Sequence, residues 1–357
     1  MARLFLSMAG EGRGHATRAR SMVEQLRARH QIELFCPGDA HDFLAPVYKG
    51  ADVRVHHIPG PRFHYTPDHK LDYPATGKMA WDYFRALPGL TRKLLRHFEK
   101  SPPDLCIVDF EPALPRACVK AGVPFVSVNH QHFLLACDLS DLPRRIRRHV
   151  AYMPHIVRLY HTAQRRTVVS SFFFPPVKPR WRHATMVGTL LRPELLAARP
   201  TREGHVVAYI RKHETPEIME SLRGCGMPVH LYGLGLRPAD KNITFHAINE
   251  ESFLRHLASC EAIVCTAGNQ LIGESLYLGK PVFGLPELNN WEQYINAFYC
   301  KQAHCGDYSD YDKVTPGRLR RFLARADEYR ANMDPEKLNG IPPTINVIEE
   351  TLRELGR

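Results

Sequence analysis

The chain alternates between short apolar runs and longer stretches in which apolar residues recur every three or four positions. Arg3–Met8 is such a run and predicts a buried strand, and Gln31–Cys36 predicts the next one. Between them, a glycine-rich turn leads into a stretch with Ala16, Ala19 and Val23 on one helical face. This order of strand, turn, helix and strand is typical of the start of a doubly wound parallel sheet.

The alternation continues to the end of the chain and predicts two α/β halves. Prolines gather around 175–200, which indicates a linker. We therefore expect an N-terminal domain at 1–175, a linker at 176–203, a second domain at 204–340 and a closing helix at 341–357. Further strands are expected at Asp104–Phe110, Pro124–Val128, His205–Ile210, Val229–Tyr232, Ile243–Ile248, Ala262–Cys265 and Val282–Leu285. Further helices are expected at Trp81–Lys100, Glu217–Arg223, Leu271–Leu278, Pro316–Met333 and Ile345–Leu355.

Two stretches depart from this alternation. Gly60–Thr76 is rich in Pro, His and Tyr, has no clear period and is expected to form a long loop. Leu142–Arg166 is expected to be helical with a break at Pro154, and its arginines, from Arg144 to Arg166, flank one apolar stripe. Such a basic amphipathic helix can lie on an anionic membrane, or it can be an ordinary surface helix docked by its stripe.

Composition narrows the class of protein and of partner. The 357 residues include 44% hydrophobic and 24% charged ones, as in a globular protein with a sizeable core, and no apolar run approaches a membrane span. The first residues do not form a signal peptide, so we expect a cytoplasmic protein, with a peripheral place on the inner face of the cell membrane as an extension. The formal net charge of +11 predicts an anionic partner, and the lack of RNA-recognition and finger signatures argues against nucleic acid.

The nine cysteines show no disulfide framework and are expected to be mostly small buried hydrophobes in a reducing compartment. Cys260/Cys265 and Cys300/Cys305 form two C-x4-C pairs, but no histidine completes a recognisable zinc set. We therefore expect no metal site.

Candidate chemistry follows from fold class, because ligands of open α/β sheets bind beyond the carboxyl ends of the strands. This rule selects Gly10–His15, Asp109–Glu111, Asn129–His132 and Thr266–Glu274. In the first of these, the glycines allow close backbone approach, and the helix N-terminus that follows favours an anion. A tight turn without a ligand is the alternative.

Each of the three predicted strand ends in the N-terminal half carries side chains that can act as acids or bases. His15 lies at the mouth of its helix and could act as a general base, or it could cap or orient the loop. Asp109 and Glu111 could each position or deprotonate a hydroxyl, or bond to the loop backbone. His130 and His132 have the spacing of a metal pair, but hydrogen bonding to an acceptor or a structural role is favoured.

The C-terminal segment Cys260–Asn296 is the most informative. Thr266–Asn269 is a turn of small residues leading into a helix and suits a diphosphate. Glu274 lies one to two turns into that helix, where a carboxylate can accept from two ribose hydroxyls. Glu292 and Gln293 follow a loop rich in Asn and Trp and offer groups for sugar hydroxyls.

At these residues the sequence resembles the GT-B glycosyltransferases, specifically the family 28-like branch that contains the bacterial peptidoglycan GlcNAc transferase. The resemblance rests on Gly10–Ala19 (GEGRGHATRA) and on Thr266–Asn296, and the order of elements between them agrees. It implies two facing Rossmann-like domains with a cleft between them and a C-terminal helix that crosses back to the first domain. It also implies transfer without a metal and with inversion of the anomeric centre.

The resemblance implies roles for single residues, with one departure. The first loop carries Glu11 and Arg13 where the peptidoglycan enzyme's loop is plainer, so the acceptor need not be the same, and Gly60–Thr76 has no counterpart. The acceptor and phosphate loop would consist of Gly12, Arg13, Gly14 and His15. The donor site would consist of Ile248 at the base, Thr266, Gly268 and Asn269 at the diphosphate, Glu274 at the ribose, and Glu292 and Gln293 at the sugar.

The sequence thus predicts a glycosyltransferase that moves a sugar from a nucleoside-diphosphate sugar, with uridine favoured by the resemblance, to a hydroxyl acceptor. The basic stretch suggests a lipid-linked or cell-envelope acceptor. His15 is the first choice for the base, followed by Glu111 and Asp109, and no cofactor besides the donor is expected. The alternatives are a UDP-sugar 2-epimerase, and a non-enzymatic membrane-surface or nucleotide-binding protein.

Overall fold

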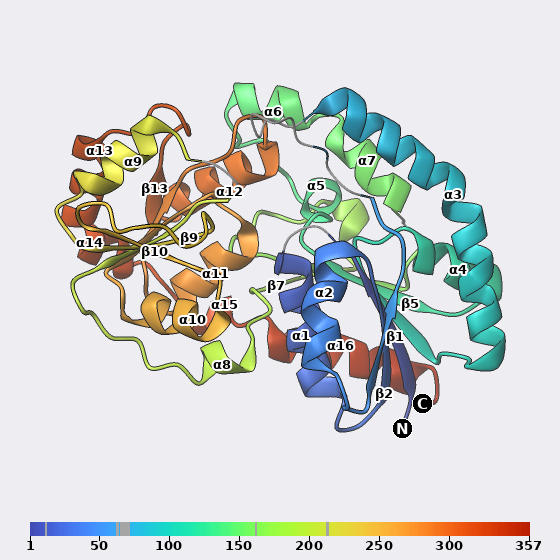
Figure 1. The fold of residues 1–357 in the computed structure, drawn as a ribbon. Helices are drawn as coiled ribbons and strands as arrows, with labels where there is room; N and C mark the ends of the chain where they lie inside the picture. Colours follow the sequence, from blue (N-terminus) through green and yellow to red (C-terminus); the bar gives the residue numbers. More distant parts are fainter. Residues whose placement is uncertain (11–12, 62–63, 65–71, 161–162, 212–213) are drawn as a thin grey trace. The chain divides into compact units, whose positions relative to one another are not determined.

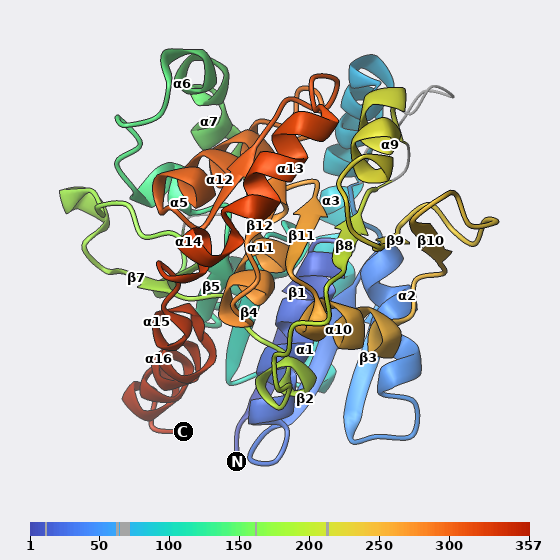
Figure 2. The same ribbon diagram turned by 90° about the vertical axis from the view of Figure 1, so that its left-hand side faces the viewer.

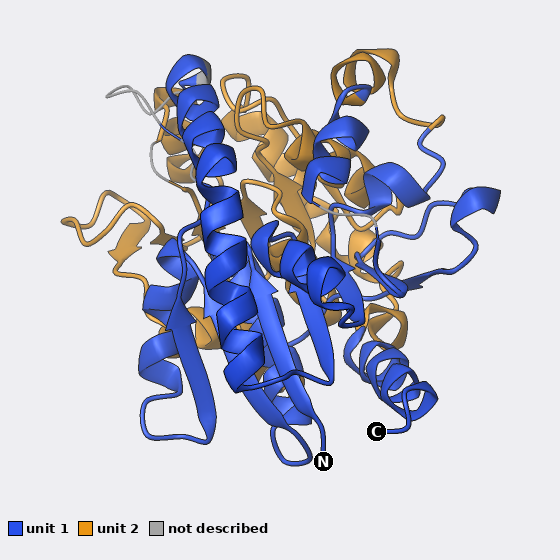
Figure 3. Cartoon of the chain, turned by 90° about the vertical axis from the view of Figure 1, so that its right-hand side faces the viewer, with its two compact units in different colours: residues 1–139, 151–193, 340–357 blue, residues 140–150, 194–339 orange. Residues whose placement is uncertain are grey.

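The computed structural model describes residues 1–10, 13–61, 64, 72–160, 163–211 and 214–357, in which helices and strands alternate (Figure 1). The chain divides into two compact units (Figure 3). The first unit consists of Met1–Leu139, Ala151–Pro193 and Gly340–Arg357, and the second of Ser140–Val150 and Glu194–Asn339. None of the helices among these residues is long and apolar enough to cross a membrane.

The first unit is built on a seven-stranded parallel sheet in the order β3-β2-β1-β4-β5-β6-β7. Its strands are β1 (Arg3–Met8), β2 (Gln31–Cys36), β3 (Val53–His57), β4 (Leu105–Asp109), β5 (Phe125–Asn129), β6 (Arg166–Ser170) and β7 (Ala184–Val187). Its helices are α1 (Arg13–Leu26), α2 (Gly38–Val47), α3 (Tyr73–Lys100), α4 (Ala113–Ala121), α5 (Phe133–Ala136), α7 (Met153–Tyr160) and α16 (Ile341–Glu354), with a 3-10 turn, η1 (Pro179–Trp181).

Helices cover both faces of this sheet because its central strands are apolar on both sides. In β1, Leu4 and Leu6 belong to a core that includes residues of α1 and α16, which lie side by side (Figure 2). Phe5, between them, points to the other face and joins a second core with residues of α3 and α4. Because β1 and β4 are parallel neighbours, their carboxyl ends lie side by side at one edge of the sheet, where β1 is followed by α1 and β4 by α4.

The second unit is built on a six-stranded parallel sheet in the order β10-β9-β8-β11-β12-β13. Its strands are β8 (Val206–Tyr209), β9 (Val229–Tyr232), β10 (Ile243–His246), β11 (Ala262–Cys265), β12 (Val282–Gly284) and β13 (Gly306–Tyr308). Its helices are α6 (Arg144–Val150), α9 (Pro216–Arg223), α10 (Glu250–Ser259), α11 (Asn269–Tyr277), α12 (Trp291–Gln302), α13 (Pro316–Ala324), α14 (Ala326–Arg330) and α15 (Pro335–Leu338), and α8 (Pro193–Leu196) spans the boundary between the units.

Two expectations from the sequence were wrong. The stretch 176–203 is not simply a linker, because β7 lies within it and pairs with β6 as the seventh strand of the first sheet. The stretch Leu142–Arg166 was expected to be helical with a break at Pro154, but the break between α6 and α7 lies before Met153, and Arg166 already begins β6. Pro154 stands in the first turn of α7, where a missing N–H costs nothing, so it starts a helix instead of kinking one.

Of the expected loop Gly60–Thr76, residues 62–63 and 65–71 lie outside the described residues, and its last residues begin α3. The predicted helix Pro316–Met333 is broken at Arg325 into α13 and α14.

Candidate functional site

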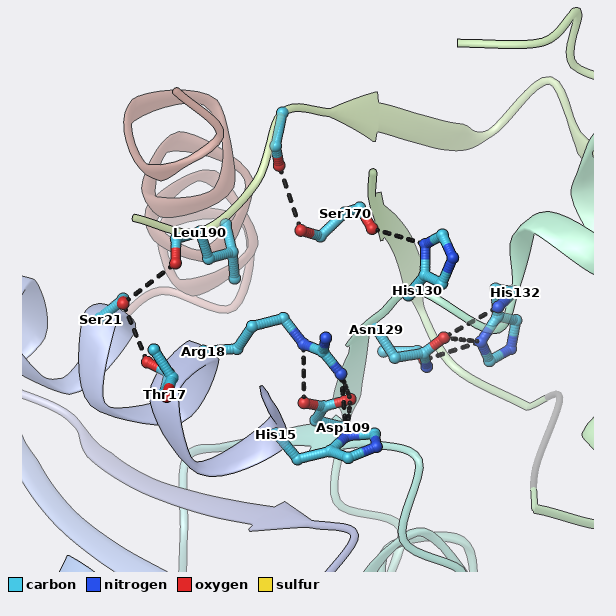
Figure 4. A network of polar contacts seen from close by, with 12 residues as sticks. His15, Thr17, Arg18, Ser21, Asp109, Asn129, His130, His132, Ser170 and Leu190 are labelled. Carbon is cyan, nitrogen blue, oxygen red and sulfur yellow. Dashed lines mark hydrogen bonds and ion pairs between the residues drawn. The ribbon is translucent and has the colours of Figure 1, made fainter. Parts of the chain in front are cut away.

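The carboxyl ends of β1 and β4 bring His15 and Asp109 together (Figure 4). In the parallel register Met8 pairs with Asp109, and the backbone N–H of Ala9 donates to the Asp109 carbonyl at 2.9 Å. The chain then enters α1, whose first turn carries His15 back over the end of β4. His15 Nδ1 lies 3.0 Å from Asp109 Oδ1.

Arg18 holds Asp109 from the other side. Its Nε donates to Oδ2 and its Nη2 to Oδ1, both at 3.0 Å, so the pair is bidentate. Arg18 stands one helical turn after His15, and its Nη2 also lies 2.8 Å from His15 Nδ1. The side chains of His15, Arg18 and Asp109 therefore all contact one another at this strand end.

Asp109 is an ionised carboxylate in a buried position. Burial alone would raise the pKa of Asp109, but Arg18 and His15 outweigh it and hold that pKa below its ordinary value. The His15 side chain is 14% exposed, against 2% for Asp109. An Asp–His pair with only the imidazole reaching solvent suits proton transfer to or from a bound hydroxyl.

Glu111 has different partners, although it follows Asp109 by only two residues. Its Oε1 accepts from Ala113 N at 2.6 Å and its Oε2 from Leu114 N at 2.8 Å, so it satisfies the first N–H groups of α4. Tyr83 Oη also donates to Oε1, at 3.3 Å. Burial raises the pKa of Glu111, and these hydrogen bonds partly oppose it. This is the backbone-binding alternative named from the sequence.

His130 and His132 are buried and bonded internally. His130 Nδ1 lies 3.0 Å from the Ser170 carbonyl, and His132 Nδ1 lies 2.8 Å from Asn129 Oδ1 (Figure 4). Asn129 Oδ1 also accepts from the His132 N–H at 2.9 Å. The two rings therefore secure the turn after β5, and contact with an acceptor stays a prediction.

The first residue of the glycine-rich turn, Gly10, packs against Pro37 too closely for any other residue type. A Cβ on Gly10 would lie 2.5 Å from the Pro37 carbonyl oxygen, so the two chain segments could not approach with any side chain there. Arg13 begins α1 and places its guanidinium 5.6 Å from the ring centre of Phe43, and Gly14 follows it in the helix. Gly12 lies outside the described residues.

The second unit contains a turn between β11 and α11 that includes Thr266, Gly268 and Asn269. Ala267 adopts a positive φ of 57°, and Asn296 Nδ2 donates to the Ala267 carbonyl at 3.0 Å, which pins this strained residue. Gly268 is the N-cap of α11 and provides no side-chain cap. The N-cap residue of α11 thus makes no side-chain hydrogen bond to the first turn, which suits a phosphate-binding helix.

Glu274 is buried within α11 at 1% exposure, and Gln270 Nε2 donates to its Oε1 at 3.0 Å. Ile248 follows β10 and is 45% exposed. The predicted ribose and base contacts of these two residues stay predictions.

The loop before α12 fixes Gln293. Its Oε1 accepts from Glu287 N at 2.7 Å and its Nε2 donates to Glu287 Oε2 at 3.2 Å, while Asn290 caps the helix by accepting from Gln293 N. Glu292 precedes it, in the first turn. These hydrogen bonds join the loop to the first turn of α12, where the sequence predicts sugar recognition.

The arginine-rich helix α6 packs on this same helix of the second unit, which agrees with the surface-helix alternative named from the sequence, although the partner helix was not predicted. His149 of α6 stacks on Trp291 with ring centres 3.9 Å apart and planes at 3°. Arg145 lies over Trp291 and Tyr294, and Tyr299 donates to Asp141 at 2.7 Å. Both His149 and Arg145 of α6 thus contact aromatic rings of α12.

The cysteines are buried and free. Burial raises the pKa of Cys260 and of Cys265 to about 12, and that of Cys305 to about 11, which keeps these thiols protonated and poor metal ligands.

Sequence reasoning gave no role to two residues of the site, although each lies within one of the two motifs that carry the resemblance. Arg18 stands three positions after His15 on the buried side of α1. Asn296 ends the second motif, and its contact with Ala267 was not predicted.

The family model for Glycosyl transferase family 1 matches residues 2–327. The chain belongs to this glycosyltransferase family. No curated protein matches the sequence of the transferase.

Solved structures of glycosyltransferases are similar to this chain over nearly its full length. Because each is less than 25% identical in sequence, this similarity shows the fold alone. The Arabidopsis thaliana enzyme UGT89C1, complexed with UDP-L-rhamnose, has 14% identity, 99% coverage of both chains and a TM-score of 0.69. The calicheamicin glycosyltransferase CalG4 has 16% identity, 100% coverage of both chains and a TM-score of 0.66. The Acinetobacter baumannii MurG has 13% identity, covers 98% of this chain and 100% of its own, and has a TM-score of 0.62.

The predictions of a GT-B fold and of a glycosyltransferase are therefore confirmed. The branch named from the sequence is not singled out, because MurG is one of many glycosyltransferases that match the fold equally well.

Proposed function

We propose that the transferase moves a sugar from a UDP-sugar to an acceptor hydroxyl, with inversion at the anomeric carbon and without a metal ion. The observation that carries the proposal is the contact of 3.0 Å between His15 Nδ1 and the buried carboxylate of Asp109. Similar structures support the donor: UGT89C1 was solved with UDP-L-rhamnose, and Phytolacca americana UGT2 with UDP-2fluoro-glucose and pterostilbene.

The geometry supports His15 as the base. If its Nδ1–H donates to Asp109 Oδ1, the lone pair of Nε2 is left for the acceptor hydroxyl. Asp109 stays ionised beside Arg18, and its charge stabilises the imidazolium that forms as the proton moves to Nε2. General-base catalysis of this kind contributes roughly 10²–10⁴-fold in rate.

Inversion is supported by the state of the two carboxylates at this strand end. Retention by double displacement needs a carboxylate nucleophile that can reach the anomeric carbon. Asp109 is held by Arg18 and His15, and Glu111 by the backbone of α4. Because both carboxylates are held by these contacts, a single displacement by the acceptor oxygen fits the site better than a covalent intermediate.

The donor is assigned to the second unit. The first turn of α11, after Thr266 and Gly268, would bind the diphosphate and stabilise the charge of the leaving nucleotide. Glu274 would bind the ribose, and Glu292 and Gln293 the sugar. These assignments rest on the motif and on the hydrogen-bonded turns that contain it.

We further propose a lipid-linked or membrane-proximal acceptor, as in the peptidoglycan branch. The support is the surface of α7 and the turn before it, where Tyr152, Ile156 and Leu159 are 53%, 44% and 54% exposed beside the exposed Arg158. An apolar row next to basic side chains suits an anionic lipid surface.

The donor is tested by thermal unfolding of the full chain with a panel of nucleotide-sugars that differ in base and in sugar. A ligand that binds only the folded state raises Tm by mass action, by several degrees at concentrations far above Kd. We expect UDP-sugars to stabilise the chain and the corresponding ADP- and GDP-sugars not to. Matching shifts from all bases would contradict the UDP assignment.

The reaction type is tested by incubating the chain with its best donor, alone and with hydroxyl acceptors. UDP release that depends on the acceptor supports transfer. Formation of a new UDP-sugar without an acceptor would show an epimerase instead.

A further inference from the structure

Three side chains with metal-binding atoms converge in the first unit, away from the strand ends described above. Glu33 lies in β2, His56 in β3 and His97 near the C-terminal end of α3. His56 Nε2 is 2.7 Å and His97 Nε2 is 2.9 Å from the same oxygen, Glu33 Oε2. The ligand atoms of all three residues lie within 4.8 Å of one another.

The convergence on a single oxygen is the informative feature. A carboxylate has two oxygens, and two histidine donors could be satisfied on separate ones. Here both rings approach Oε2, with their planes 69° apart, while Oε1 accepts from Ser101 Oγ at 3.2 Å. The two Nε2 atoms and Oε2 therefore lie next to one another, as the ligand atoms around a single cation do.

Rigid elements hold this arrangement. The ring of His56 stacks on Phe35 at 4.9 Å with planes at 18°, and the ring of His97 packs against Phe5 at 5.4 Å. Glu33 is 4% exposed, and a carboxylate buried to this degree needs compensation by hydrogen bonds or a cation. Arg54 Nη1 lies 3.8 Å from Glu33 Oε1, and the side chain of Arg54 is 76% exposed.

We propose that Glu33, His56 and His97 bind one Zn²⁺ ion. Two imidazole nitrogens and one carboxylate oxygen are a ligand set that zinc accepts at about 2.0–2.2 Å, with ligand atoms about 3.3 Å apart in a tetrahedral site. The two contacts at 2.7 and 2.9 Å need to open by only about half an ångström to admit the ion. The side chains of His56 and His97 are 34% and 29% exposed, so water reaches the fourth position.

The ion would tie three elements together at the edge of the sheet. α3 has 28 residues, and His97 lies in its last turn, while β2 and β3 are the outer pair of strands. Because the binding free energy of a metal adds to folding when the unfolded chain offers no site, zinc binding would stabilise the first unit.

A second group of histidines within the described residues, His230, His246 and His256, is less suitable. The rings of His230 and His256 stack at 4.0 Å with planes only 20° apart. Lone pairs that lie in nearly parallel planes do not converge on one ion. This group serves as the internal alternative in the test.

The test measures zinc in the full-length chain, purified without a histidine tag. The protein is stripped with EDTA, exposed to ZnCl₂, passed through gel filtration and analysed for zinc by atomic spectrometry. We expect one zinc per chain in the wild type, and at least a tenfold loss in Glu33→Gln and in His97→Asn. His304→Asn, at an exposed position outside the cluster, should retain the metal.

Two outcomes would overturn the proposal: a wild-type chain that retains no zinc, and zinc that survives Glu33→Gln and His97→Asn but is lost in His246→Asn. If the variants fail to fold, the site can still be tested on the wild type alone by chemical modification of its histidines. Zinc should reduce carbethoxylation of His56 and His97 by diethyl pyrocarbonate at least severalfold, as mapped by mass spectrometry. Equal modification with and without zinc would contradict the site.

Discussion

At the scale of single residues, His15 and Arg18 compete for the same oxygen. Arg18 Nη2 and His15 Nδ1 both lie 3.0 Å from Asp109 Oδ1 and 2.8 Å from each other. If Nδ1 accepts from Arg18, the ring proton sits on Nε2 and His15 cannot act as a base. If Nδ1 donates to Asp109, Nε2 is free. The negative charge of Asp109 therefore favours the tautomer of His15 that carries its proton on Nδ1 and can act as a base. Arg18 favours the other tautomer.

Asp109→Asn is expected to lower kcat by roughly 10²–10⁴-fold, because an asparagine no longer favours the Nδ1–H tautomer or stabilises the imidazolium. The affinity for the donor should stay within about twofold, since Asp109 is assigned no donor contact. Initial rates of UDP release and donor titrations measure the two quantities.

Glu111→Gln is the matched control on the same strand end. It removes one charge from a group that binds Ala113 N and Leu114 N, so we expect a loss of about 1–2 kcal/mol in the free energy of unfolding and near-normal kcat. A large fall in kcat for Glu111→Gln with Asp109→Asn near wild type would transfer the role of base partner to Glu111.

The residue types of this site could be predicted from the sequence, but their pairing could not. Polar residues after apolar runs marked the strand ends, and general topology placed ligands there. The contact of Arg18 with Asp109 spans 91 positions and depends on β1 lying beside β4 in one register, which no local pattern specifies.

At the scale of elements, α10 packs on a sheet face made partly of imidazoles. His230 lies in β9, His246 ends β10 and His256 belongs to α10, with His205 stacked edge-on against His230. Tyr232 Oη bonds to His256 Nδ1 at 2.7 Å. Burial, and then the neighbouring histidines, lower the pKa of His230 and of His256 to about 4.

The second unit should therefore lose stability as the pH falls. The pKa values of His230 and His256 are lower in the folded than in the unfolded state, so between about pH 6.5 and 4 the unfolded chain binds more protons. The stabilisation is complete above this window and is lost on acidification. We expect a loss of about 2 kcal/mol between about pH 7 and pH 5, after a discount for partial exposure, as measured by urea unfolding.

His256→Gln is the control, because glutamine does not titrate and can still bond to Tyr232. Its stability should fall about half as steeply with acidification as that of the wild type. Parallel pH profiles for the two proteins would contradict the assignment to this cluster.

Several elements were predictable in detail and others were not, for reasons of composition. β1, β2, β9 and β11 have the bounds expected from their apolar runs. β3 reads VRVHH and β13 only GDY, so neither carries an apolar run. β6 follows directly on arginine-rich sequence, and β7 lies among prolines, where turn signals obscure a four-residue strand.

At the scale of the whole molecule, the formal charge of +11 predicts binding to anionic surfaces. We expect the chain to float with vesicles that contain anionic lipid and to be released at high salt, because exposed charges are screened within about 10 Å at 0.1 M ionic strength. Reversing the exposed Arg158 of α7, together with the exposed Arg147 and Arg148 just before it in the chain, to Glu should reduce flotation at least severalfold.

A variant with Arg92, Lys93 and Arg96 of α3 reversed to Glu changes the net charge equally at other exposed positions. It should float nearly as well as the wild type if Arg158 and the arginines just before it contact lipid. An equal loss of flotation in both variants would show that only the net charge matters. Vesicle binding that depends neither on salt nor on the charge of the lipid would exclude an electrostatic contact.

The division of the chain has a consequence for exchanging donor specificity between relatives. The chain passes from one unit to the other after Leu139, Val150, Pro193 and Asn339. A chimera joined once, at Pro193, would keep the parental α6 against a foreign α12 and bring a foreign α16 to the parental α1. Transplanting the second unit as a folded piece therefore takes four junctions, with Ser140–Val150 and Glu194–Asn339 moved together.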